Sequence, residues 1–205
     1  NALISMGLHQ ELSGLLVVSM EQAVAAPYCG LMLADAGARV IKIERKEGDF
    51  ARGYDRGANG NSVFFSWLNR GKESIAIDLN SDDDEALLRS MLEKADVFLH
   101  NLAPGALARR GFGGDALREH NSGLITCEIN GYGSSGPGAR KKAYDFLVQA
   151  ESGICAINGT REQPARVGIS ICDIASGQTA FSSILRALIQ RGRTGTGIDI
   201  SIAMF

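Results

Sequence analysis

The sequence predicts a doubly wound α/β domain built around a mostly parallel sheet, and the first part of the chain carries this prediction best. Leu15–Val18 is a short continuous apolar run, typical of a strand that is covered on both faces. A helical segment opened by Pro27 and stopped by Gly37 follows, and Arg39–Glu44 is a second strand. Strand, helix and strand in close succession indicate a βαβ unit, and therefore a parallel sheet.

The same alternation continues through the rest of the chain. Ser81 and the aspartates after it provide a cap and negative charge for the start of a helix. The further predicted strands are 74–78, 97–99, 124–129 and 198–202, and the predicted helices are 81–94, 116–119, 144–151 and a long one from Asp173. Ligands of doubly wound sheets bind at the carboxyl ends of the strands, so residues that follow strands are the first candidates for a site.

Composition and charge narrow the class of protein. The 205 residues suffice for one full-sized domain, and 45% hydrophobic with 21% charged residues is ordinary for a soluble globular protein. A net charge of −2 favours a small-molecule or protein partner over nucleic acid or an anionic membrane. The cysteines form no C-x-x-C pair and no membrane span or signal peptide is apparent, so we expect a cytoplasmic protein without a metal site.

The predicted domain covers residues 15–205. Residues 1–14 form an N-terminal segment, and its opening Asn1-Ala2 has the look of an expression remnant. Phe205 follows a strand directly, with no helix after it to cover that strand. We therefore expect the chain to be the first part of a longer protein.

Basic residues follow successive predicted strands. They are Arg45, Arg70, Lys72, Arg109 and Lys142. A polyphosphate ligand at the strand ends explains the whole set, whereas each of them alone is equally consistent with a solvated charged turn.

The Gly131–Gly136 string matches the dinucleotide-binding pattern G-x-G-x-x-G and follows a predicted strand. Pro137 and Gly138 follow at once, so no helix opens there to receive a pyrophosphate. The sequence therefore argues against NAD binding.

Asp173 is the leading candidate for a catalytic residue. It stands where the long apolar helix is predicted to begin, so free backbone N–H groups and the helix dipole are expected to keep its carboxylate ionised. The plain alternative is an N-cap aspartate without a catalytic role. The sequence has no G-x-S-x-G elbow, which leaves a carboxylate as the leading nucleophile.

Taken together, several strings resemble those of the family III CoA-transferases (the CaiB/BaiF family), which include formyl-CoA transferase and the 2-methylacyl-CoA racemases. In chain order they are LADAGARVIKIE with GDFAR, NRGKESIAIDL, ADVFLHNLAPGALARRGF, GYGSSGP, YDFLVQAESG and VGISICDIASG. The resemblance runs from about Leu15 to Phe205 and covers the N-terminal half of the family chain.

The resemblance implies a Rossmann-like large domain, a smaller second domain outside this chain, and an interlocked homodimer. It also implies coenzyme A as part of an acyl-CoA substrate, a small carboxylic acid as its partner, and no metal. Asp173 falls on the catalytic aspartate. By position, Arg45 and Arg109 meet the nucleotide end of CoA, Val24, Ile77, Asn101 and Lys142 line its path, and Tyr144 lies by the acyl or acceptor group.

The implied reaction moves CoA from an acyl-CoA thioester to a free acid through aspartyl anhydride and aspartyl-CoA thioester intermediates. The racemase alternative needs a histidine directly before the residue that matches Asp145, and Tyr144 stands there instead. A phenol, with an ordinary pKa of about 10, is a poor base at neutral pH. A CoA-binding fragment without catalytic activity is the second alternative.

Overall fold

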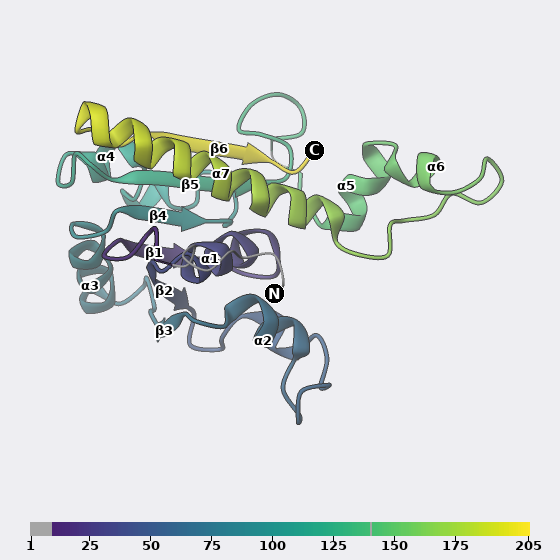
Figure 1. Cartoon of the computed structure of the whole chain (residues 1–205), viewed down its shortest axis with the longest axis horizontal. Coiled ribbons are helices and arrows are strands. Elements are labelled where there is room, and N and C mark those ends of the chain that lie inside the picture. Colours follow the sequence, from purple (N-terminus) through teal and green to yellow (C-terminus); the bar gives the residue numbers. More distant parts are fainter. Residues whose placement is uncertain (1–9, 140) are drawn as a thin grey trace.

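The sheet has the topology that the sequence predicts. The computed structural model describes residues 10–139 and 141–205. Six parallel strands lie in the order β3-β2-β1-β4-β5-β6 (Figure 1). They are β1 Leu16–Met20, β2 Arg39–Glu44, β3 Glu73–Ala76, β4 Val97–His100, β5 Ile125–Asn130 and β6 Asp199–Ala203. This is the strand order of the Rossmann fold, and its direction reverses between β1 and β4.

Helices cover both faces of this sheet, which confirms the doubly wound architecture (Figure 1). The helices are α1 Ala25–Asp35, α2 Val63–Asn69, α3 Asp82–Leu92, α4 Gly114–Arg118, α5 Asp145–Glu151, α6 Ile154–Asn158 and α7 Ile171–Thr194, with 3₁₀ turns η1 Phe50–Gly53 and η2 Ala108–Arg110. Side chains of α1 and α7 share one hydrophobic cluster with the sheet, and side chains of α3 and α4 share another.

The central strands are apolar on both faces because both faces are covered. In β4, Val97 and Leu99 belong to the cluster with α1 and α7, while Phe98 belongs to the cluster with α3 and α4. All three are fully buried. Such strands lack an alternating pattern, which is why short continuous apolar runs located them correctly in the sequence.

Two parts of the chain extend from the sheet and shape the site. The pair α5 and α6, which we call the arm, projects beyond the carboxyl ends of the strands (Figure 1). The short helix α2, which the sequence did not predict, begins at Ser62, whose hydroxyl accepts a hydrogen bond from the Phe65 N–H at 3.1 Å. Helix α6 was likewise not among the helices predicted from the sequence.

The four cysteines are free thiols, and Cys29, Cys127 and Cys172 are buried. Within the described residues, no helix has the length and apolar composition that crossing a bilayer requires. The prediction for Asn1-Ala2 concerns residues outside the described ranges.

Candidate active site

Two cavities lie at the carboxyl ends of the strands. One, of about 440 Å³, adjoins the ends of β2 and β3 and is lined by Arg45 and Ile77, among others. The other, of about 600 Å³, lies between the ends of β1, β4 and β5 and the first turn of α7. Gln22 and Leu102 line both cavities, which are therefore adjacent parts of one strand-end surface.

The structure brings most of the predicted site residues to this surface. Those that line the larger cavity are Val24, Asn101, Lys142, Tyr144 and Asp173. Arg45 and Ile77 line the smaller one. Arg109 lies on η2 with an exposed side chain and lines neither cavity.

Asp173 does not occupy the N-cap position of α7. The helix begins at Ile171, its N-cap is Ser170 without a side-chain cap, and Asp173 is in its first turn. The free N–H groups of Cys172 and Asp173 donate instead to Oδ1 of Asp145, at 2.8 and 3.2 Å. The N-cap reading of Asp173 is therefore wrong, because a carboxylate from α5 performs the capping.

Asp145 is itself held by a buried glutamine. Gln149 Nε2 donates to Oδ2 of Asp145 at 2.6 Å, and Gln149 Oε1 accepts from the Val167 N–H at 2.8 Å. Gln149 is fully buried. The arm, the segment before α7 and the first turn of α7 are thus joined by one set of hydrogen bonds.

Asp173 is a poorly solvated carboxylate. Burial, and then the nearby charge of Asp145, raise the pKa of Asp173 to about 7. Within the described residues, no hydrogen-bond donor contacts its carboxylate oxygens. The expectation that the helix start keeps this group firmly ionised is therefore wrong, because burial and the charge of Asp145 disfavour its ionised form. Such a carboxylate is well suited to nucleophilic attack, since little solvation has to be removed from it.

The turn between β1 and α1 lines both cavities and is held from two sides. Asn101 accepts from the Gln22 N–H at 2.9 Å and donates to the Gln22 carbonyl at 2.8 Å. The next residue, Ala23, has φ of 62°, a left-handed conformation that is uncommon outside glycine. Its N–H donates to Oδ1 of Asp49 at 3.3 Å. Asn101 therefore positions this turn with its own amide.

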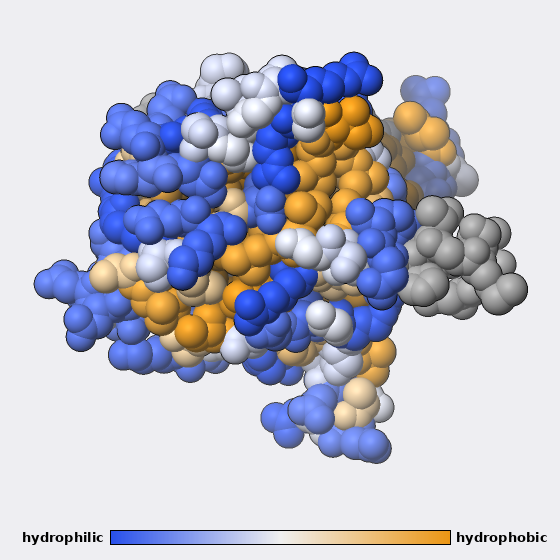
Figure 2. Space-filling view, turned by 60° about the vertical axis from the view of Figure 1, so that its left-hand side comes forward, coloured by the Kyte–Doolittle hydropathy of each residue, from blue (hydrophilic) through white to orange (hydrophobic). Residues whose placement is uncertain are grey.

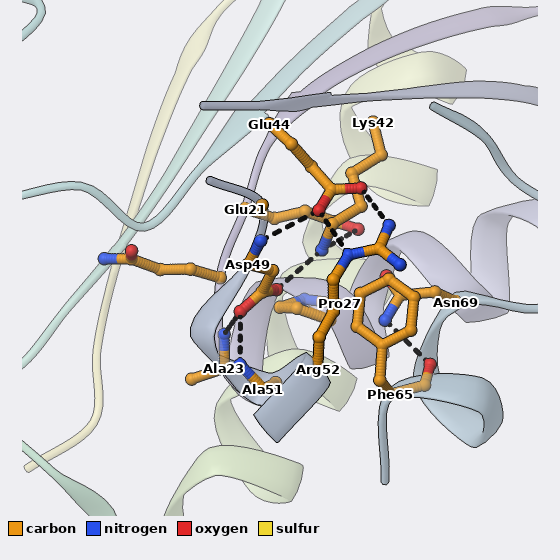
Figure 3. Close-up of polar contacts among 12 residues, drawn as sticks. Glu21, Ala23, Pro27, Lys42, Glu44, Asp49, Ala51, Arg52, Phe65 and Asn69 are labelled. Atoms are coloured by element: carbon orange, nitrogen blue, oxygen red, sulfur yellow. Dashed lines mark hydrogen bonds and ion pairs between the residues drawn. The ribbon is translucent and has the colours of Figure 1, made fainter. Parts of the chain in front are cut away.

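A buried ionic network lies next to this turn and supports it (Figure 3). Lys42, whose side chain is 1% exposed, contacts Asp49 at 2.8 Å and Glu21 at 3.7 Å. Lys72 also pairs with Glu21 and donates to the Pro27 carbonyl at 2.9 Å. Burial lowers the pKa of Lys72, and the carboxylate of Glu21 opposes that shift.

This network corrects part of the predicted row of cations. Lys72 is engaged beneath the site, and Arg70 pairs with Asp35 on the helix surface. Of the five predicted cations, Arg45 and Lys142 line the cavities. The sequence did not reveal that Lys72, directly before β3, pairs with the buried Glu21, since that contact spans 51 residues.

Glu44 closes the network at the base of the smaller cavity. Burial acts to raise the pKa of Glu44, but hydrogen bonds from Arg52, Ser74 and the Asp49 N–H outweigh it and lower that pKa to about 2. Glu44 is therefore a fixed anion, in contrast to Asp173, whose pKa is raised to about 7.

Across residues 10–139 and 141–205, no three His, Cys, Asp or Glu side chains gather in a way that could hold a metal ion.

Fold and site together define a Rossmann-like ligand-binding domain with a desolvated carboxylate at its strand ends. The sequence profile of CoA-transferase family III matches residues 12–205. The chain belongs to CoA-transferase family III.

Comparisons with named relatives and with a solved structure agree with this family membership. The chain is 41% identical over 195 residues to the acetyl-CoA:oxalate CoA-transferase of Acetobacter aceti, covering 94% of this chain and 50% of that protein. It is 38% identical over 203 residues to the succinate–glutarate CoA-transferase of Agrobacterium fabrum, covering 94% and 50%. The crystal structure of a CaiB/BaiF family protein from Brucella suis superposes with a TM-score of 0.89 at 36% identity, covering 96% of this chain and 54% of that one. The chain thus spans about half the length of the curated relatives it matches.

Proposed function

We propose that the full-length protein transfers CoA from an acyl-CoA thioester to a free carboxylic acid, with Asp173 as the nucleophile. The observation that carries the proposal is the poorly solvated Asp173 carboxylate in the wall of the larger cavity. Relatives named for CoA transfer between carboxylic acids support it. The two adjacent cavities suit an elongated ligand such as CoA.

The reaction proceeds in balanced steps. A carboxylate oxygen of Asp173 attacks the thioester carbonyl, the C–S bond breaks, and an aspartyl–acyl anhydride and CoA thiolate result. The thiolate attacks the aspartyl carbonyl, which releases the donor acid and leaves an aspartyl-CoA thioester. The acceptor carboxylate then attacks that thioester, which expels the CoA thiolate and leaves an anhydride between Asp173 and the acceptor. The thiolate attacks the acceptor's carbonyl in this anhydride, which releases the new acyl-CoA and regenerates the Asp173 carboxylate. Covalent steps of this kind divide one difficult exchange into easier ones.

The remaining site residues take the roles that the family resemblance gives them. Arg45 and Arg109 bind the nucleotide end of CoA, Val24, Ile77, Asn101 and Lys142 line its path, and Tyr144 lies beside the acyl group. Tyr144 is 60% exposed at the mouth of the larger cavity, which leaves room for a substrate next to it. For the complete protein we further propose residues 15–205 as the CoA-binding large domain, a smaller second domain, and an interlocked homodimer.

The test uses the full-length protein with Asp173→Asn and Asp173→Ala. Loss of exchange between acyl-CoA and free acid in both variants is expected, together with a hydroxylamine-sensitive adduct on Asp173 in the unmodified protein. Undiminished exchange in either variant would sink the assignment. A protein that binds acyl-CoA but forms no adduct and exchanges no acid favours the non-catalytic alternative, and loss of optical activity of a 2-methylacyl-CoA favours the racemase.

A further inference from the structure

A cation in the larger cavity has no part in the proposed chemistry. Arg166, on the segment between α6 and α7, lines this cavity together with Asp173. Its guanidinium carbon lies 6.0 Å from the centre of the Phe146 ring, and Phe146 lines the same cavity. An aromatic face beside a guanidinium is a common support for that group.

Hydrogen bonds hold the backbone at Arg166 in place, whereas its guanidinium has no acidic partner among the described residues. Asn158 Nδ2 donates to the Arg166 carbonyl at 3.0 Å, and the following Val167 N–H donates to Gln149 at 2.8 Å. In the part of the chain that the structure describes, no carboxylate pairs with the Arg166 guanidinium. Lys141 in the same cavity is different, because it pairs with Glu151 at 3.2 Å.

The carboxylates that line the cavity do not serve as partners for Arg166. Asp145 is buried and accepts hydrogen bonds from the first turn of α7. Asp173 is the proposed nucleophile. A guanidinium presents paired N–H donors that match a carboxylate bidentately, so the exposed Arg166 in the cavity wall is available to bind an anionic group on the ligand.

We propose that Arg166 selects acids with a second carboxylate. This inference rests on the proposed function, in which one carboxylate of each acid reacts at Asp173 and becomes an acyl group. That carboxylate loses its charge in the reaction and cannot remain the partner of Arg166. A second carboxylate on the same acid keeps its charge and binds the guanidinium, which orients the reacting end. Arg166 is therefore a specificity-determining residue.

The test compares two acids of equal chain length, succinate and butyrate, as acceptors for one acyl-CoA donor in the full-length protein. Arg166→Gln is expected to raise the KM for succinate about tenfold to a hundredfold, the loss expected for a charge-assisted pair, and to leave the KM for butyrate unchanged. Arg166→Lys is expected to retain part of the preference for succinate over butyrate, since lysine keeps the positive charge but lacks the paired N–H donors of the guanidinium. Arg161→Gln is the matched control, because Arg161 is exposed on the same segment and outside the cavity.

The contradicting results are specific. An equal rise in KM for both acids, a rise in the KM for acyl-CoA alone, or no change in Arg166→Gln overturns the inference. A thermal shift by succinate that is absent with butyrate and absent in Arg166→Gln supports it even without turnover, and an unaltered succinate shift in Arg166→Gln overturns it. Transfer to butyrate with no effect of Arg166→Gln leaves the proposed function standing and removes only the role of Arg166. Transfer to neither acid counts against the proposed function and not against Arg166.

Discussion

At the scale of single residues, the site places a carboxylate where the fold does not favour its charge. The pKa of Asp173 in the folded protein, about 7, lies above its ordinary value of 3.8. Such a group contributes stability that is full below pH 4 and is lost as the pH rises through 7. The proposed nucleophile therefore costs the folded protein stability at neutral pH, as is common for active-site groups.

Replacing Asp173 by Asn should make the fold more stable at high pH. Asn carries no charge, so the advantage of the variant is expected to grow between pH 4 and 7 and to reach about 1–3 kcal/mol at pH 8, a range discounted for partial solvent exposure. Chemical denaturation at pH 5 and pH 8 measures it. Equal free energies of unfolding for variant and natural protein at pH 8 would contradict the burial argument.

Replacing Asp145 separates its charge from its hydrogen bonds. Asp145→Asn keeps an acceptor for the first turn of α7 but removes the charge that raises the pKa of Asp173. The acid limb of the pH–rate profile is therefore expected to move to lower pH. Asp145→Ala also removes the cap and should cost about 1–2 kcal/mol of stability. A profile that stays in place in Asp145→Asn would show that burial alone sets the pKa of Asp173.

The sequence revealed Asp173 but not how it is held. Its position before an apolar helix and within a family motif singled it out. The cap from Asp145 joins residues 27 positions apart, and the pairing of Lys72 with Glu21 joins residues 51 apart. Contacts of that range depend on how the elements pack, which local patterns do not encode.

At the scale of elements, the crossing of α1 and α7 fixes the distance between the two sides of the site. Helix α1 follows the turn that lines both cavities, and α7 carries Asp173. The helices meet at Gly177, where an added Cβ would lie 2.6 Å from the Ala25 carbonyl oxygen and 3.0 Å from Tyr28 Cδ1. A glycine there permits the close approach.

Gly177→Ala should push the two helices apart. Overpacking is expected to cost about 1–3 kcal/mol of stability, more than the helix propensity of alanine returns, and to lower kcat by displacing Asp173. Gly192→Ala is the matched control, since it lies on the same helix with no atom within 4 Å of the added Cβ. That variant should gain up to about 1 kcal/mol. Thermal unfolding of both variants tests the contrast, and a Gly177→Ala protein as stable as Gly192→Ala would refute it.

Whether the sequence predicted an element depended on how deeply the element is buried and on how long it is. The central strands and the long helices were located correctly, because burial on both faces or an amphipathic repeat marks them. Helix α2 spans only Val63–Asn69 and is secured by tertiary contacts, among them Asp55 accepting from the Val63 N–H at 2.8 Å. So short a helix has too few periodic positions to be predicted.

At the scale of the whole molecule, much apolar surface stays exposed. Figure 2 shows apolar side chains exposed between polar ones on one face of the molecule. Exposed apolar residues also occur on the arm, where Ile157 is 86% exposed and Phe146 and Leu147 are more than one-third exposed. Patches of this kind usually mark contact with another protein surface.

Coverage of the arm can be measured by hydrogen exchange. In the full-length protein, backbone amides of α5 and α6 should exchange more slowly than in a segment limited to residues 10–205, because the proposed second subunit or second domain would cover them. Light scattering should give twice the mass of one chain. Equal exchange in both samples, together with the mass of a monomer, would contradict the proposed homodimer.

The route between the last two strands bears on how the chain folds. Asp199 of β6 pairs with Thr126 of β5 across 73 residues, a span that contains the whole arm and α7. Arg118, at the end of α4, holds the same aspartate at 2.6 Å. Closing so long a loop is entropically costly and slow relative to local pairing. Strand β6 is therefore expected to dock late, so that the cavity holding Asp173 is completed only after the rest of the sheet has formed.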